Sequence, residues 1–177
     1  MTGVMSSYRR VSLSGGTFFF TVNLAERGSH LLVERIADLR TAYGAVQAEL
    51  PFRTDAIVVM PDHIHAVWTL LDGDSDFSTR WKKIKTGFSK SILRSPATGG
   101  LAPTLRISAS KREKGEVGIW QRRFWEHTIC SPSDLAEHLR YCWTNPVKHG
   151  FVTDPADWPY SSFHRDLEVG WVQTHRM

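Results

Sequence analysis

The chain has 177 residues, of which 41% are hydrophobic and 23% charged, as expected for one folded domain spanning residues 1–177. Its two cysteines are too few for a disulfide framework or a cysteine-based zinc ribbon. No run reaches the roughly 18 apolar residues of a membrane span, and no signal-peptide core is present, so we expect a cytoplasmic protein with no membrane partner. The net charge of +4 and the pI of about 9.3 favour a polyanionic partner.

Four strands and two helices are predicted in the order of a ferredoxin-like fold. Aromatic and β-branched residues predict a strand over 17–24, and apolar residues at helical spacing predict a helix over 30–50. Residues 52–60 and 63–71 read as a hairpin, residues 77–93 as a helix, and 120–129 as the region of a fourth strand. This split βαβ order predicts an α+β fold, with an antiparallel sheet and both helices on one face.

Two segments are expected to lie outside the predicted ferredoxin-like fold. Residues 1–14 form a basic arm in which Arg9 and Arg10 could bond guanine and Tyr8 could stack on an unpaired base; a disordered basic terminus is the alternative. Residues 95–118 are rich in Gly, Ser, Pro and Lys without clear periodicity, so we expect a mobile loop there.

Basic residues gather on the second predicted helix. Between residues 80 and 94 there is no acid, and the cations are Arg80, Lys82, Lys83, Lys85, Lys90 and Arg94. Such a stretch is either a solvated helix face or a surface for a phosphate backbone, with the first four residues as the candidate DNA contacts. Arg122 and Arg123 beside Phe124 are a further candidate. These contacts would position DNA rather than read its sequence.

A His-hydrophobic-His pattern, His63-Ile64-His65, lies within a predicted strand. Alternate side chains of a strand share a face, so both imidazoles would project together while Ile64 enters the core behind them. Two neutral histidines on one face form half of a metal site. They could equally be polar residues on a solvent-exposed face of the strand, because two ligands alone do not make a metal site.

A third helix is predicted to begin at Ser131, which offers an N-cap, with Pro132 at the first helical position and Asp134 completing the first turn. Leu135, Leu139 and Cys142 share one face and would dock on the sheet.

At about 100° per residue, Tyr141 and Asn145 lie about 40° apart at the edge of the docking stripe. His138 falls on the same edge. Because Pro146 disfavours helical geometry in the residue before it, we expect the helix to end near Asn145 and to leave its amide accessible.

These residues bring a family into view: the chain resembles the REP-associated tyrosine transposases, a branch of the single-tyrosine HUH nucleases. The matching segments occur in the family's order over nearly the whole chain. They are Tyr8-Arg9-Arg10, residues 16–24, Met60-Pro61-Asp62-His63-Ile64-His65, residues 120–127, Tyr141, and Asn145-Pro146-Val147-Lys148-His149-Gly150.

The resemblance implies a ferredoxin-like nuclease that binds hairpin-forming single-stranded DNA from repetitive extragenic palindromes (REP). It implies that Tyr141 is the nucleophile, cleaving and rejoining DNA through a 5′-phosphotyrosine bond, and that His63, His65 and Asn145 are metal ligands. Related transposases outside this branch have glutamine where this chain has Asn145.

The family points to Mg²⁺ or Mn²⁺, whereas ligand softness alone would suit zinc or another transition metal. The branch favours a monomer, although related transposases exchange the tyrosine helix between subunits in a dimer. His138, Glu126 and His127 could lie next to the metal ligands and the tyrosine and support them without binding the metal, or they could have a purely structural role.

Other functions compete with this interpretation. A non-catalytic module that binds structured nucleic acid would use the same sheet and basic helix, but it gives no reason for two histidines opposite a tyrosine and an asparagine. A metal hydrolase would need further ligands, and a histidine-triad nucleotidyl transferase would need a histidine at the position of Val67. The sequence leaves open which palindrome is bound and whether the protein nicks or transposes DNA.

Overall fold

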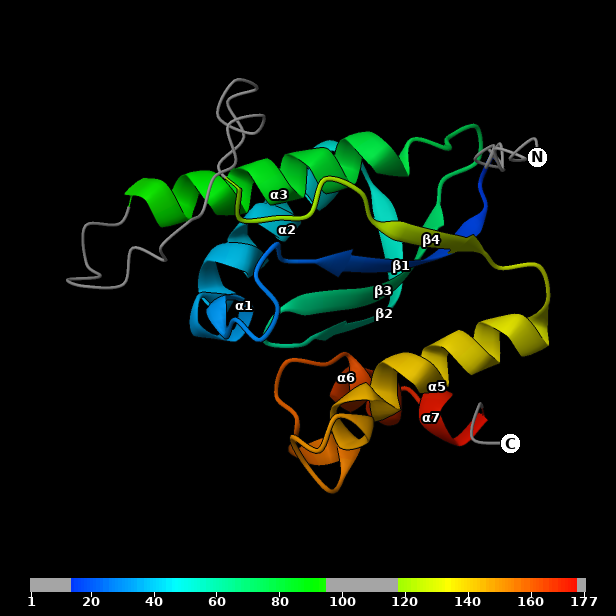
Figure 1. Cartoon of the computed structure of the whole chain (residues 1–177). Helices are drawn as coiled ribbons and strands as arrows, with labels where there is room; N and C mark the ends of the chain where they lie inside the picture. The colour runs from blue at the N-terminus through cyan, green and yellow to red at the C-terminus, as the bar shows by residue number, and fades with distance from the viewer. Residues whose placement is uncertain (1–13, 95–117, 175–177) are drawn as a thin grey trace, which may run out of the picture.

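The computed structural model describes residues 14–94 and 118–174. They form a four-stranded antiparallel sheet in the order β2-β3-β1-β4, with helices on both faces (Figure 1). The strands are β1 (Thr17–Asn23), β2 (Phe52–Val59), β3 (His63–Leu70) and β4 (Trp125–Thr128). The helical elements are α1 (Leu31–Glu34), α2 (Ile36–Glu49), α3 (Phe77–Arg94), α5 (Pro132–Lys148), η1 (Pro155–Asp157), α6 (Phe163–Glu168) and α7 (Trp171–Thr174).

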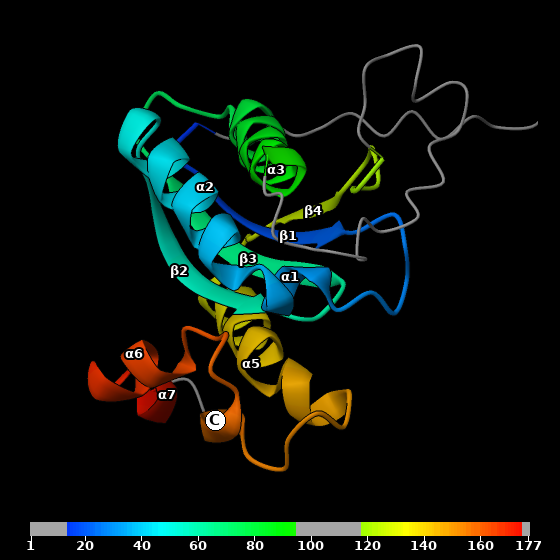
Figure 2. The same ribbon diagram turned by 90° about the vertical axis from the view of Figure 1, so that its left-hand side faces the viewer.

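The strand order and the pairing are those of the predicted ferredoxin-like fold. Helices α2 and α3 cover one face of the sheet, and α5 crosses the other with α6 and α7 beyond it (Figures 1 and 2). The first core lies between the sheet and α2 and α3, and includes Ile64, Trp68 and Trp81. The second core lies between the sheet and α5, and includes Val67 and Leu139. Both faces of β3 are therefore buried.

The helix predicted over 77–93 is confirmed as α3, and its apolar residues Phe77, Trp81, Ile84 and Phe88 are all buried. The single helix expected over 30–50 is instead divided at Arg35, whose backbone (φ −115°, ψ 34°) leaves the helical region. In the short helix α1 that results, Leu32 is buried and its N–H donates to the Pro61 carbonyl at 3.2 Å. This hydrogen bond attaches α1 to the turn that precedes His63.

The fourth strand is shorter than the region 120–129 predicted for it. Trp120 pairs with Leu24 in an isolated bridge, and the Gln121 N–H donates to the Asn23 carbonyl at 3.0 Å. The chain then leaves the sheet and returns to pair with β1 at Trp125. The intervening Phe124 packs against the first core, which gives this interruption a physical cause.

The segment after α5 covers the edge strand β2. Its residue Ser161 bridges Val58, and the Val59 N–H donates to the Tyr160 carbonyl at 2.8 Å. Behind it, Asp166 is buried and accepts hydrogen bonds from the Trp143 indole at 2.9 Å and the Ser162 hydroxyl at 2.7 Å. These bonds attach α5 to the C-terminal helices and leave β2 with no open edge at this point.

Within the described ranges 14–94 and 118–174, no helix has the length and apolar character needed to cross a membrane.

Arg80 departs from its expected role. Although it belongs to the basic stretch of α3, its side chain is 3% exposed and turned into the protein. Its guanidinium donates to the carbonyls of Leu50, Pro51 and Asp76 and to the carboxylate of Asp74. The expectation that Arg80 contacts DNA is wrong for this position, because its donors already hold the α2–β2 connection to the start of α3.

Replacing Arg80 with methionine should therefore destabilise the fold by about 3 kcal/mol, since the Leu50 and Pro51 carbonyls and the Asp74 carboxylate would lose the donors of this buried guanidinium. Urea unfolding at pH 7 measures this loss. Lys82→Met, at an exposed position on the same helix, is the matched control and should change the free energy of unfolding by less than about 0.5 kcal/mol. Equal effects of the two substitutions would contradict the structural role of Arg80.

Candidate active site

Both histidines of the His-Ile-His pattern lie on the sheet face that α5 covers. Strand alternation sends Ile64 into the first core, while His63 and His65 lie on the opposite face with 8% and 4% exposure. Their ring centroids are 4.8 Å apart. The two imidazoles are therefore neighbours on one face, as the pattern predicts, and they are largely removed from solvent.

A carboxylate orients the first imidazole. His63 Nδ1 lies 2.6 Å from Asp62 Oδ1, and the other Asp62 oxygen accepts the Gly28 N–H at 2.8 Å. Burial alone would raise the pKa of Asp62, but the hydrogen bonds from Gly28 and His63 and the nearby charges hold it below its usual value. An ionised Asp62 accepts the Nδ1 proton of His63, which leaves the Nε2 lone pair available to a metal.

The second imidazole is held in a similar way. His65 Nδ1 lies 2.9 Å from the Thr21 hydroxyl on the neighbouring strand β1. Burial, together with the charges of His63, His149 and Lys148, lowers the pKa of His65 to about 3. His65 is therefore neutral at physiological pH, which is the form in which histidine binds a metal.

Tyr141 of α5 lies directly against His65. Their ring centroids are 5.0 Å apart with an interplanar angle of 77°. Phe19 meets the tyrosine edge-on at 5.7 Å, and Lys148 Nζ lies 5.1 Å from the centre of the phenol ring. The predicted nucleophile and one predicted metal ligand are thus in contact within a single chain, with a cation beside them.

Asn145 follows Tyr141 by one helical turn but is not at an accessible tip. It is fully buried, and neither Oδ1 nor Nδ2 has a hydrogen-bond partner among the described residues. A buried amide without partners is costly unless a ligand satisfies it. Two imidazoles and an unsatisfied amide oxygen are a donor set that suits a divalent cation.

The helix end was wrongly predicted, because Pro146 lies inside α5, which continues to Lys148. The end is set instead by Gly150, which has a positive φ of 73°. The Gly150 N–H donates to the Val147 carbonyl at 2.9 Å, and the Phe151 N–H to the Pro146 carbonyl at 3.0 Å. This pair of bonds is a Schellman motif, and it sustains the last turn despite the hydrogen bond that proline cannot make.

The three residues expected to support the site do not act alike. His138 lies beside Phe19, with ring centroids 4.6 Å apart, and His127 is the cross-strand neighbour of Phe19. Glu126 pairs with Phe20, whose side chain belongs to the first core, so Glu126 lies on the opposite face of the sheet. A supporting role for Glu126 at the tyrosine is therefore wrong on strand alternation alone.

The remaining basic candidates lie in different settings. Lys82, Arg122 and Arg123 are exposed, whereas Lys83 forms an ion pair with Glu49. Lys85 Nζ donates to the Gln121 carbonyl at 2.6 Å and so secures the chain just before the two arginines. Tyr8, Arg9 and Arg10 lie outside the described residues, as does nearly all of the loop predicted over 95–118.

Several residues at the site were not singled out from the sequence. Asp62 and Thr21 orient the histidines, Lys148 lies over the tyrosine, and the His149 ring centroid is 5.5 Å from that of His63. Trp125 projects from β4 on the same face and is 52% exposed. All of these residues lie in the segments that match the family, but their contacts depend on strand register and helix docking.

Comparison with known proteins gives a consistent result. A REP-associated tyrosine transposase of Escherichia coli K12 is 43% identical over 166 residues, covering 94% of this chain and 87% of the relative. A Haemophilus influenzae relative with the same family name is 42% identical over 165 residues, covering 93% and 89%. A solved structure of a REP-associated tyrosine transposase bound to a REP hairpin matches with a TM-score of 0.76 and 43% identity, covering 94% of this chain and 88% of that one. No protein-family model matches the chain.

The ferredoxin-like sheet, with its histidine pair facing a tyrosine helix, belongs to the tyrosine transposase class of DNA-cleaving enzymes. Within that class, the chain belongs to the REP-associated tyrosine transposase family. Membership of this family suggests the use of a metal.

The neutral state of His65 predicts a pH-dependent stability in metal-free protein. Its pKa is about 3 in the folded chain against an ordinary value of 6.5, so the unfolded chain binds the proton more readily. This contribution is fully present above pH 6.5 and is lost as the pH falls toward 3. His65→Gln should reduce the loss of stability on acidification by up to about 1.4 kcal/mol per pH unit between pH 6 and 4.

Urea unfolding in EDTA, at several pH values, measures the difference between the two proteins. Exposed His164 on α6 provides the matched control, because His164→Gln should leave the acid dependence of the wild type unchanged. A parallel pH dependence of wild type and His65→Gln would contradict the burial of a neutral imidazole at this position.

Proposed function

We propose that this chain is a metal-dependent single-stranded DNA endonuclease and strand transferase that binds REP-type hairpins and acts through Tyr141. The observation that carries the proposal is the contact between Tyr141 and His65, with ring centroids 5.0 Å apart, beside a second histidine oriented by Asp62. The relative bound to a REP hairpin, which is 43% identical, supports hairpin DNA as the ligand.

In the proposed reaction, Tyr141 Oη attacks the scissile phosphorus and forms a phosphotyrosine bond to the 5′ side of the break. The bond from phosphorus to the 3′ oxygen breaks; the phenol gives up its proton, and the departing 3′ oxygen gains one. Rejoining reverses these changes, because an incoming 3′-hydroxyl displaces Tyr141 from the phosphorus. The ester retains the energy of the cleaved bond, so no nucleotide cofactor is required.

The chain's own residues prepare the scissile phosphate. His63, His65 and Asn145 would hold Mg²⁺ or Mn²⁺, which when bound withdraws charge from a non-bridging phosphate oxygen. Asp62 and Thr21 fix the two imidazole orientations in advance, so little reorganisation is needed. Lys148, with Nζ 5.1 Å from the phenol ring centre, adds positive charge where the phosphate would lie.

Both halves of this site come from one chain, which supports a monomeric enzyme rather than one that exchanges the tyrosine helix. Exposed Trp125 lies on the same sheet face, 5.7 Å from Phe19, and an exposed indole is suited to stack on an unpaired base. The exposed arginines Arg122 and Arg123 precede it and would follow the phosphate backbone. Tyr8, Arg9 and Arg10 remain sequence-based candidates for reading bases next to the hairpin.

The tyrosine assignment is tested by covalent trapping. Incubated with a labelled single-stranded REP hairpin and Mg²⁺ or Mn²⁺ and then denatured, the wild type should yield a protein–DNA adduct. Tyr141→Phe should reduce adduct formation by roughly 1,000-fold or more, because it removes the attacking oxygen while retaining the ring that packs on His65.

Tyr160→Phe is the matched control, since Tyr160 packs on Trp158 beside the edge strand β2, with ring centroids 5.3 Å apart, and it should leave adduct formation unchanged. An adduct that still forms with Tyr141→Phe would contradict the assignment of Tyr141 as the nucleophile. Hairpin binding without cleavage would favour the non-catalytic binding module, and cleavage without an adduct would favour a hydrolase.

The arginine pair leads to a separate prediction about salt dependence. Arg122→Ala/Arg123→Ala should weaken binding to matched and mismatched hairpins alike and reduce the slope of log K against log salt by about 1–2. Fluorescence anisotropy between 50 and 300 mM salt measures both effects. Arg40→Ala, an exposed charge on α2, serves as the control and should change neither. A loss confined to one base substitution in the hairpin would refute backbone contact.

A further inference from the structure

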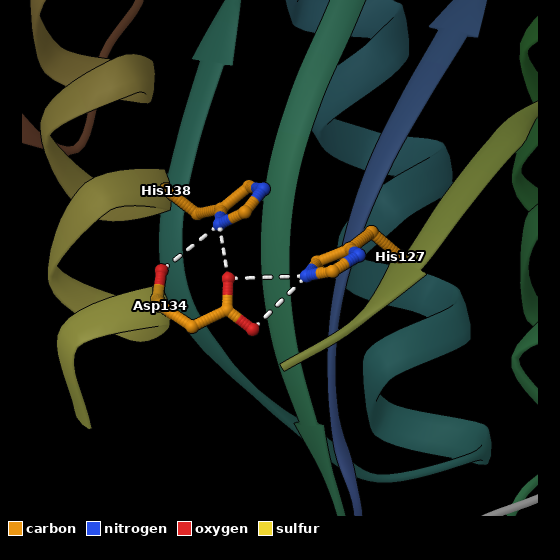
Figure 3. A group of neighbouring side chains, drawn as sticks. All are labelled: His127, Asp134 and His138. Carbon is orange, nitrogen blue, oxygen red and sulfur yellow. Dashed lines mark hydrogen bonds and ion pairs between the residues drawn. The ribbon is translucent and has the colours of Figure 1, made fainter. Parts of the chain in front are cut away.

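A second cluster of possible ligands lies where β4 meets the start of α5. His127 Nε2 is 3.0 Å from each carboxylate oxygen of Asp134. His138 Nδ1, one turn further along α5, is 3.0 Å from Asp134 Oδ1 and 2.9 Å from the Asp134 carbonyl. Figure 3 shows both imidazoles turned toward the carboxylate between them. The two rings are nearly parallel at 16°, with centroids 4.8 Å apart.

This cluster is separate from the His63–His65 pair. Phe19 lies between the two groups, with its ring centroid 4.6 Å from that of His138 and 5.5 Å from that of His65. On the sheet, Phe19 is the cross-strand neighbour of His127. The two groups share no residue, so the ligands of one can be substituted while those of the other are retained.

The geometry points to a second cation site formed by His127, Asp134 and His138, suited to a transition metal such as Zn²⁺ or Co²⁺. Two imidazole nitrogens and one carboxylate oxygen, with water in the open position, are a donor set that these ions favour. One ligand atom from each residue lies within 4.8 Å of the others. Bonds of about 2.0–2.2 Å to a tetrahedral ion hold ligands roughly 3.3–3.6 Å apart, so small side-chain rotations close the site.

The surroundings prepare these residues for a metal. Asp134 Oδ2 accepts the Cys130 N–H at 2.8 Å, while the Asp134 N–H donates to the Ser131 cap, so the helix start fixes the carboxylate. The side chains of His127, Asp134 and His138 are 36%, 20% and 17% exposed, which gives an ion access from solvent. Metal binding requires that each imidazole present its facing nitrogen as a lone pair instead of an N–H, so His138 Nδ1 would exchange its hydrogen bond to the Asp134 carbonyl for the metal.

An ion in this site would act as a clamp on the tyrosine helix. His127 lies on the edge strand, whereas Asp134 and His138 lie on α5, so shared coordination ties the two elements together. His138 precedes Tyr141 by three residues, and Phe19 contacts both rings. Occupancy should therefore restrain α5 relative to the sheet and raise the thermal stability of the chain.

The test uses untagged full-length protein stripped of metal and titrated with Co²⁺, whose visible absorption reports ligand geometry. The background is His63→Ala/His65→Ala, which removes the first pair of ligands. This protein should bind one equivalent of Co²⁺, and its Tm should rise with added ion.

Adding His127→Gln/His138→Gln should abolish both responses while leaving the metal-free Tm within about 2 °C, because glutamine can still donate to Asp134 but is a poor ligand for these ions. His164→Gln, at an exposed histidine outside the cluster, is the matched control and should keep both responses.

Failure of the His63→Ala/His65→Ala protein to bind Co²⁺ would overturn the proposal, as would Co²⁺ binding that survives the glutamine substitutions. Either result would leave the cluster as a hydrogen-bonded clamp without an ion. Neither would affect the assignment of Tyr141, which is measured by adduct formation with Mg²⁺ in an otherwise wild-type chain.

Discussion

The site depends on one interaction, which is the packing of α5 on the sheet face opposite α2 and α3. Leu139 and Cys142 are fully buried there, against Phe19 and Val67 among other residues of the second core. Full burial of a side chain of this size contributes about 1.5–3 kcal/mol, far more than any single polar contact at the site. Because Tyr141 lies beside this stripe, docking the stripe brings the phenol against His65. The geometry of the proposed active site is thus a consequence of core packing.

Strand β3 supplies the complementary constraint. Its alternate residues serve two different cores, since Ile64 and Trp68 lie under α2 and α3 while His63, His65 and Val67 face α5. A shift of one residue in its pairing with β1 would exchange the two sets and place histidines in an apolar core. The apolar residues therefore fix the register, and the histidines occupy positions that the fold cannot easily move.

The elements were largely readable from the sequence because their signals are local. Alternation predicted the shared face of His63 and His65, and the cap at Ser131 correctly predicted the start of α5. The errors arose where a tertiary interaction outweighed a local rule. Pro146 suggested a helix end, but the bonds around Gly150 sustain another turn. Arg80 belonged to a basic run, yet nearby carbonyls and Asp74 draw its side chain inward.

Similarly, sequence could not reveal the polar groups that the fold buries without partners. The amide of Asn145 was expected to be accessible at the helix end, but the continued helix buries it, and neither polar atom has a partner among the described residues. Burying such a group lowers the free energy of unfolding by about 1–3 kcal/mol. The buried neutral His65 next to Tyr141 lowers it further at acidic pH. A ligand that satisfies the amide and both imidazoles binds only the folded chain, so it recovers this free energy and stabilises the arrangement that the proposed cleavage reaction requires.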